Sequence, residues 1–252
     1  MRKSYRELTE EIKTDGERLK LIAALGSSDD LAYHYALISE DWAAGGTLML
    51  ENSFDRHGEA GIVFLLERLR AFGTASKTDA SAAAGTATGT GAYTDTAYLA
   101  AKILSQLRHR DFYAARAKEL AALLTARWEI SNIALRRKQI IALGWIGSEA
   151  EVDVLIRTMQ GDTDALCRAW AAAALMQLSF HAVDAAFLRE KTKTAFAEAI
   201  QKEGDLNAAG IMIEAAQTLF GKKWISAAAA EAAEPESIEK AKKSALRFLG
   251  KV

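Results

Sequence analysis

The sequence contains a single cysteine, Cys167, in 252 residues. One cysteine excludes an intramolecular disulfide framework and any zinc site that is built from several cysteines. A chain without disulfides is typical of a reducing compartment, so we expect a cytoplasmic location. Cys167 itself falls at an apolar position of a predicted helix and is expected to be a buried, unreactive thiol.

An excess of basic charge is also absent. The chain has 32 lysines and arginines against 33 aspartates and glutamates, which gives a net charge of −1 at pH 7. Proteins that bind the phosphate backbone of a duplex usually show a clear basic excess. We therefore expect no nucleic-acid partner, and any basic surface has to be local.

Long apolar runs are missing as well. No stretch of about 18 uncharged apolar residues occurs, so no membrane-spanning helix is predicted. The N-terminal stretch MRKSYRELTEEIKTDGERLK is rich in charge and lacks the apolar segment of a signal peptide. No secretory leader is therefore predicted.

Runs of alternating Val, Ile, Thr and Tyr, which are typical of strands, do not occur either. Apolar residues recur instead at spacings of three and four, the pattern of amphipathic helices. Helices are predicted over 3–13, 16–25, 29–40, 59–72, 94–108, 112–127, 132–146, 149–160, 164–179, 182–202, 206–220 and 236–249. Gly147 and Gly161 are expected to end helices, and Ser148 and Asp162 to cap the helices that follow. The predicted fold class is all-α, built from short helix–turn–helix units.

Two of these helices share a sequence pattern. Residues 135–146 (LRRKQIIALGWI) superpose on residues 167–178 (CRAWAAAALMQL) at an offset of 32, which aligns an arginine and an Ala-Leu pair. Residues 96–107 and 211–222 fit more loosely, at successive offsets of 39 and 44. Self-similarity with a period of about 30 to 50 residues is typical of a helical solenoid.

The turn and helix that follow residue 161 contain a second pattern, formed by Asp162, Cys167, Arg168, Ala171, Ala174 and Leu175. With these residues the segment resembles the inter-helix turn and second helix of a HEAT repeat. The resemblance implies a right-handed α-solenoid of stacked helix pairs, with a concave surface lined by the second helices. It also implies an aspartate–arginine contact between turns. The spacing of Asp162 and Arg168 predicts a structural salt bridge between these two residues.

One segment differs from the helical remainder. Residues 73–95 (GTASKTDASAAAGTATGTGAYTD) have almost no bulky side chain. Such a composition buries too little apolar area to offset the entropy of ordering the chain. We predict a helical region over 1–72, a flexible loop over 73–93 and the repeat array over 94–252, with 1–72 continuing the same solenoid. The alternative is a loop that becomes ordered on a partner.

Complete catalytic and metal-binding motifs are lacking. The four histidines, His34, His57, His109 and His181, are not at metal-ligand spacings and are expected at the surface or in turns. Residues 54–61 (FDRHGEAG) are interpreted as a helix-capping region of mixed charge. No nucleotide-binding, serine-hydrolase or kinase motif is complete. The chain is therefore predicted to be non-enzymatic, with no metal and no cofactor.

Two enzyme-related alternatives stay open. Residues 131–140 (SNIALRRKQI) are similar to a segment with paired arginines in HEAT-like alkylpurine DNA glycosylases. That family's aspartate beside tryptophans and its basic groove have no counterpart in this sequence. A HEAT-like cofactor lyase or chaperone is the other alternative. The leading interpretation is a protein-binding module, either an inhibitor or immunity protein that neutralises a toxin or enzyme, or an adaptor.

A helical wheel separates two faces of the matching helices. The inward face is expected to contain positions 135, 139, 142, 143 and 146. The outward face gives the candidate partner-binding residues, which are Arg137, Lys138, Ile141, Trp145, Trp170 and Gln177. Tryptophan and arginine are over-represented among binding hot spots, so these positions predict contact with another protein. In the alternative interpretation, Trp145 packs across Ala169 and Ala173 of the neighbouring helix.

Overall fold

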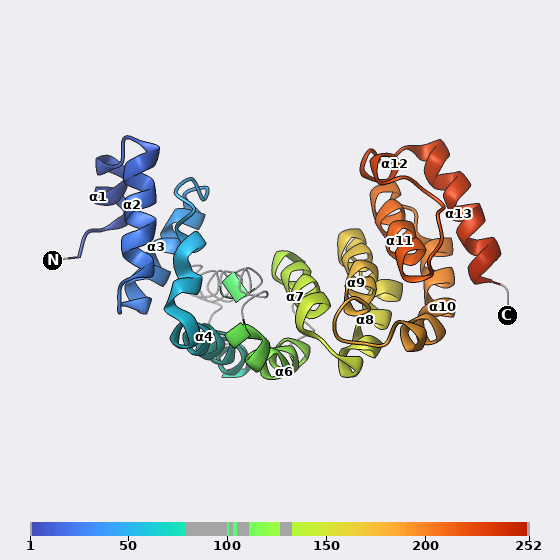
Figure 1. Ribbon diagram of the computed structural model, residues 1–252, viewed down its shortest axis with the longest axis horizontal. Coiled ribbons are helices and arrows are strands. Elements are labelled where there is room, and N and C mark those ends of the chain that lie inside the picture. Colours follow the sequence, from blue (N-terminus) through green and yellow to red (C-terminus); the bar gives the residue numbers. More distant parts are fainter. Residues whose placement is uncertain (1, 79–99, 101–102, 105–110, 127–132, 251–252) are drawn as a thin grey trace. The chain divides into compact units, whose positions relative to one another are not determined.

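The computed structural model describes residues 2–78, 100, 103–104, 111–126 and 133–250. Within these ranges every regular element is a helix, which confirms the all-α class (Figure 1). The chain divides into two compact units, the N-terminal unit Met1–Arg116 and the C-terminal unit Ala117–Val252. No helix in the described part of the chain is long and apolar enough to cross a membrane.

The N-terminal unit begins with a series of helices, and side chains cap the first three of them. They are α1 (Tyr5–Glu11), α2 (Asp15–Gly26), α3 (Leu31–Ala43), the 3-10 helix η1 (Leu50–His57) and α4 (Gly58–Thr78). The side chains of Ser4, Thr14 and Asp30 accept hydrogen bonds from first-turn amides of α1, α2 and α3. These caps satisfy backbone donors that the helices leave without internal partners.

Four of these helices occupy predicted positions, whereas η1 was not predicted. Only residues 54–57 of η1 were interpreted, as part of a capping region over 54–61, because eight residues are too few to show a helical period. Helix α4 continues to Thr78, past residue 72 where its end was predicted. The predicted loop from residue 79 onward, and most of the helix predicted over 94–108, lie outside the described residues.

A buried carboxylate fixes the turn between α3 and η1. Asp41 is fully buried and accepts hydrogen bonds from the Tyr5 hydroxyl at 2.9 Å and from the Leu48 and Met49 amides at 3.0 Å. Three donors offset the loss of hydration that makes a buried charge costly. Met49 has a φ of 56°, in the left-handed region, and its hydrogen-bonded amide helps to hold that backbone conformation.

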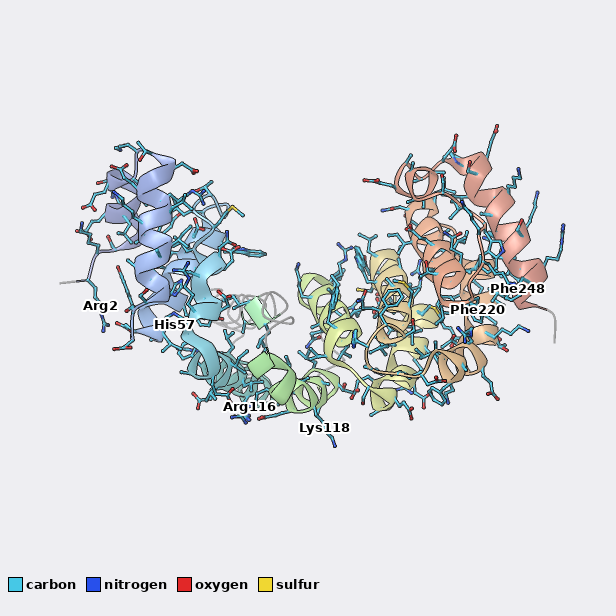
Figure 2. All side chains as sticks on the ribbon, viewed as in Figure 1. Arg2, His57, Arg116, Lys118, Phe220 and Phe248 are labelled. Atoms are coloured by element: carbon cyan, nitrogen blue, oxygen red, sulfur yellow. The ribbon has the colours of Figure 1, made fainter. Side chains whose placement is uncertain are left out.

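The prediction that the histidines lie at the surface or in turns is wrong for His34. This residue of α3 is fully buried, and its Nδ1 lies 2.8 Å from Nε2 of His57 at the end of η1 (Figure 2 labels His57). Its Nε2 lies 3.0 Å from the Leu50 carbonyl oxygen and donates to it, because a carbonyl only accepts. In the neutral pair His57 therefore donates to His34. The two rings are 23 residues apart in sequence, so no local spacing signals the contact.

Acid is expected to destabilise the N-terminal unit through this pair. Burial lowers the pKa of His34 from 6.5 to about 4, and burial also lowers the pKa of His57. Below pH 6.5 the unfolded chain takes up protons that folded His34 does not, so the free energy of unfolding falls as the pH drops toward 4. Hydrogen exchange of the α3 and α4 amides measures this loss.

The variant His34→Gln should flatten that pH dependence. His181→Gln is the control, because His181 lies in an exposed turn of the C-terminal unit, as predicted. An unchanged slope in His34→Gln would contradict the assignment. His109 lies outside the described residues.

The C-terminal unit is a succession of further helices. Helix α6 (Asp111–Thr125) spans the boundary, followed by α7 (Ile133–Ile146), α8 (Glu149–Gly161), α9 (Ala165–Leu178), α10 (Ala185–Lys202), α11 (Leu206–Leu219), α12 (Ala227–Glu231) and α13 (Pro235–Leu249). All but α12 were predicted. Ser148 caps α8 as expected, through a capping box with Glu151.

The predicted capping role of Asp162 is wrong. Helix α8 runs through Gly161, and the Asp162 amide still donates to the Thr158 carbonyl at 3.0 Å, so Asp162 ends α8. Asp164 caps α9 instead, accepting from the Cys167 amide. The residue that caps α9 therefore lies two positions later than the sequence interpretation placed it.

Helices α7, α9 and α11 are equivalent elements of successive repeats. The offset of 32 between α7 and α9 is confirmed, because both ends of these helices are 32 residues apart. The offset of 44 predicted between α9 and α11 is wrong, since Leu178 and Leu219, which end them, are 41 residues apart. Helix α10 is five residues longer than α8, and the turn before it is four residues longer.

Helices α7 and α9 come close together at a glycine. A Cβ on Gly144 would lie 2.9 Å from Cα and 3.0 Å from Cβ of Ala174, closer than real side chains come. The predicted inward residues Gln139, Ala142, Leu143 and Ile146 are all buried. Ile140 is fully buried too, so α7 buries a wider face than the wheel assumed.

Candidate functional site

A row of arginine–carboxylate pairs joins the N-terminal ends of successive second helices. Arg136 of α7 donates from Nε and Nη2 to the Asp162 carboxylate, both at 2.8 Å. Arg168 of α9 donates in the same way to Glu203, at 2.7 and 2.8 Å. Because these contacts join like ends, α7 runs parallel to α9 and α9 to α11, as predicted for the second helices.

The predicted salt bridge between Asp162 and Arg168 is therefore wrong in its partners. The Asp162 carboxylate is bound by Arg136, and Arg168 reaches only the Asp162 backbone carbonyl, at 2.8 Å. Both residues make contacts between repeats, in which each carboxylate receives the arginine of the preceding repeat. The position of Glu203 relative to α11 is that of Asp162 relative to α9, and both accept from the amide two residues later.

Arg137 makes a further pair of this kind. Its Nε and Nη2 donate to the Asp164 carboxylate at 2.8 and 2.7 Å. Asp164 also accepts from the Cys167 amide, and the Arg137 guanidinium holds the pKa of the Asp164 carboxyl well below its usual range. This candidate binding residue is thus already engaged in holding two repeats together.

Cys167 lies next to these pairs and is fully buried, as predicted. Burial raises the pKa of its thiol to about 12, and the Asp164 carboxylate adds to the effect. A thiol with such a pKa stays protonated at neutral pH and is a poor nucleophile. Cys167 therefore acts as a small apolar core residue.

The other candidate residues lie on a partly exposed strip of α7 and α9. They are Lys138, Ile141, Trp145, Trp170 and Gln177, and each is half-buried. Lys138 precedes Trp145, and Trp170 precedes Gln177, by about two helical turns. Gln177 lies beside Gly144, since its Cβ is 3.5 Å from the position of a Gly144 Cβ. The structure thus brings Trp145 and Gln177 to the same ends of parallel helices.

Trp145 is neither fully packed nor fully exposed. Its ring stacks on the His181 ring, with centroids 6.2 Å apart and planes 6° apart. His181 lies in the turn after α9, and its Nε2 donates to the Gly144 carbonyl at 3.1 Å. Sequence reasoning missed this partner, and the only signal for it was an aromatic residue in a turn. Ala169, over which Trp145 was alternatively expected to pack, is fully buried.

An exposed phenylalanine extends this cluster. Phe180 precedes His181, and 61% of its surface is exposed, the largest fraction among the exposed large apolar residues of the described chain. Aromatic side chains leaving water on binding contribute strongly to interfaces. The C-terminal end of α9 therefore presents an exposed aromatic side chain next to His181, on which the half-buried Trp145 stacks.

Comparison with known families explains this geometry. Residues 90–176 match the family model for HEAT repeats. This match supports a HEAT-like helical repeat protein. No curated protein and no solved structure matches it. The pairing of Arg168 with Glu203 lies partly beyond residue 176, so the HEAT-like geometry continues into α11. The right-handed winding stays a prediction.

The contacts of two arginines argue against the alternative interpretation of this chain as a DNA glycosylase. The paired arginines behind that resemblance, Arg136 and Arg137, are both occupied by carboxylates of the next repeat. A guanidinium neutralised in this way is a weak partner for a phosphate. Among the described residues, no three His, Cys, Asp or Glu side chains gather as a metal site requires.

Proposed function

We propose that this HEAT-like protein is a non-enzymatic protein-binding module. Its proposed contact surface is the strip of α7 and α9 formed by Lys138, Ile141, Trp145, Trp170 and Gln177, with Phe180 and His181 at its end. The observation that carries the proposal is the stacking of Trp145 on His181, which leaves the indole half-exposed. Arg137 is left out of the strip because Asp164 already binds it.

Preorganisation is the physical reason why this stacking favours binding. A side chain that is ordered before contact loses little conformational entropy when a partner covers it. The hydrogen bond from His181 to Gly144 fixes the supporting ring, and the ring in turn supports Trp145. A tryptophan held in this way can contribute about 2 kcal/mol or more to an interface.

The double variant Trp145→Ala, Lys138→Glu tests the strip. A photo-crosslinking residue in place of Gln177 captures the partner, which is then purified and titrated. We expect partner affinity to fall by roughly ten- to a hundredfold, which corresponds to about 1.4–2.8 kcal/mol. The melting temperature is measured in parallel, because Trp145 is partly packed.

The matched control is Trp42→Ala, Lys20→Glu, which makes the same changes in the N-terminal unit at a half-buried tryptophan and an exposed lysine. The control should keep full affinity. Binding that survives while the melting temperature collapses would place Trp145 in the inter-repeat packing and the partner surface elsewhere.

The finer role that we propose is an inhibitor or immunity protein of the cytoplasm, with an adaptor as the other option. The single buried cysteine and the absence of a recognised catalytic motif support this proposal. The activity of the partner, measured in a one-to-one complex with this protein, distinguishes the two roles. An inhibitor abolishes the activity of its partner at equal concentration, whereas an adaptor leaves that activity intact.

A further inference from the structure

A second surface lies at the other end of the C-terminal unit, away from the strip on α7 and α9. Three segments converge there: the start of α10, the end of α11 with the loop after it, and the last turn of α13. Arg189 donates to the Leu219 carbonyl at 3.4 Å, and the Phe220 and Phe248 rings are 6.1 Å apart (Figure 2). Residues Arg189, Lys222, Lys223, Trp224, Arg247 and Phe248 form what we name the basic–aromatic end.

The charge of this end is strongly one-sided. Residues 185–190, 219–224 and 245–249 contain four cations and a single carboxylate, Glu190, although the whole chain is nearly neutral. All four cations are exposed, and no ion pair joins them to a carboxylate in the described part of the chain. The Asp184 carboxylate, just before α10, caps this helix and accepts a hydrogen bond from the Phe187 amide at 2.8 Å.

The loop that presents two of these lysines is ordered by one side chain. Gln217 accepts from the Trp224 and Ile225 amides at 2.8 and 3.0 Å and donates to the Ile225 carbonyl at 3.1 Å. The Lys222 ammonium lies 4.6 Å from the centre of the Phe248 ring. The Lys222 cation is therefore held against an aromatic ring before any partner arrives, which lowers the entropy cost of binding.

The aromatic rings argue against a nucleic acid as the occupant. Bases bind by stacking on open ring faces. One face of Phe248 is covered by Lys222, and Trp224 lies tilted against the same ring at 5.8 Å. The half-buried rings of Trp224 and Phe248, beside four exposed ammonium and guanidinium groups, instead fit carboxylates next to an apolar side chain.

We propose that the basic–aromatic end binds an acidic segment of a protein, in which glutamate or aspartate residues flank a leucine or phenylalanine. This surface is separate from the strip of the proposed function and does not depend on it. Its charges are exposed, so their attraction is screened over a Debye length of about 8 Å at physiological salt. Binding should therefore weaken as salt rises.

The probe is a short fluorescent peptide of glutamates interrupted by leucine and phenylalanine, titrated with the full chain by fluorescence anisotropy. A peptide with lysine in place of each glutamate, and an oligothymidylate of equal length, are titrated alongside. We expect the acidic peptide to bind most tightly. The variant Lys222→Glu, Lys223→Glu should weaken its binding at least about tenfold, the loss of roughly 1.4 kcal/mol.

The matched control is Lys202→Glu, Lys240→Glu, which changes the net charge equally at exposed positions away from this end of α10 and α13. It should bind the acidic peptide within about twofold of the original chain, as should Trp145→Ala, Lys138→Glu. Because Lys222 also covers Phe248, Lys223→Glu alone is measured as well and should give a smaller loss without a change in melting temperature. Equal losses in the control, no binding of the acidic peptide, or tighter binding of oligothymidylate would each overturn the proposal.

Discussion

Replacing Arg168 with alanine is expected to lower the free energy of unfolding of the C-terminal unit by about 3 kcal/mol. Arg168 is the partner of Glu203, whose side chain is 2% exposed. Without the guanidinium, this carboxylate stays buried with only backbone donors such as the Asp205 amide. Removing one member of a buried charge pair costs more than the pair contributes, because the remaining charge loses its compensation. Urea unfolding followed by hydrogen exchange of α9 and α11 measures the loss.

Two further variants distinguish the contribution of the Arg168–Glu203 charge pair to stability from that of side-chain packing. Arg157→Ala removes an exposed arginine of α8 and should change the free energy of unfolding by less than about 0.5 kcal/mol. Adding Glu203→Gln to Arg168→Ala should recover part of the loss, because a buried amide is cheaper than a buried carboxylate. No recovery would show that the effect of Arg168 is packing of its aliphatic stem.

The pH dependence gives an independent check of the same pair. Burial acts to raise the pKa of Glu203, but the hydrogen bonds from Arg168 and nearby amides outweigh it and lower that pKa. The stabilisation is therefore present above the ordinary glutamate pKa of about 4.3 and is lost as the pH falls through the lowered value. The difference between the original chain and Arg168→Ala should shrink on acidification below about pH 4.3.

The second large effect is expected at the crossing of α7 and α9. Gly144→Leu should destabilise the C-terminal unit by about 3 kcal/mol, the upper part of the range for overpacking. A Cβ there would meet the Ala174 backbone at 2.9 Å, and a backbone cannot rotate away as a flexible side chain can. Separating the two helices would also loosen the strip that carries Trp145. Thermal and urea unfolding both measure this change.

The chain contains a matched control for this substitution. Gly161 ends α8, and a Cβ placed on it meets no atom within 4 Å. Gly161→Leu should therefore leave the free energy of unfolding within about 0.5 kcal/mol of its original value. On a Gly144→Ala background, Ala174→Gly should restore part of the stability, because it removes the contact with Cβ at 3.0 Å but keeps the Cα. Equal effects at the two glycines would contradict the close crossing.

The elements of the fold were predictable because their signals are local. Helical period and capping depend on residues three or four apart, so Ser148 and the buried face of α7 were predicted correctly. The offset of 32 between α7 and α9 followed from the matching apolar pattern. The predicted offset to α11 was wrong because α10 and the turn before it are longer than α8 and its turn. These additional residues lie outside α9 and α11, so the apolar pattern of the second helices does not show them.

The candidate strip was predictable only in part. Sequence reasoning found Trp145 and Gln177 as outward residues, but it could not find His181, which meets Trp145 across 36 positions of chain. It also counted Arg137 as a partner-binding residue, although Arg137 forms an ion pair with Asp164. A helical wheel shows which way a side chain leaves its own helix, and it contains no information about the neighbouring helix.

The sequence by itself determined that the chain is helical, with a HEAT-repeat pattern over residues 90–176, and where most of its helices lie. The tertiary structure decided which charges meet: Arg136 with Asp162, Arg168 with Glu203, and the buried ring of His34 with His57. These contacts depend on the lengths of intervening helices and turns, which set how repeats stack. Helix formation is decided within about one turn of chain, whereas the pairing of side chains 23 to 35 residues apart is decided only when the elements pack.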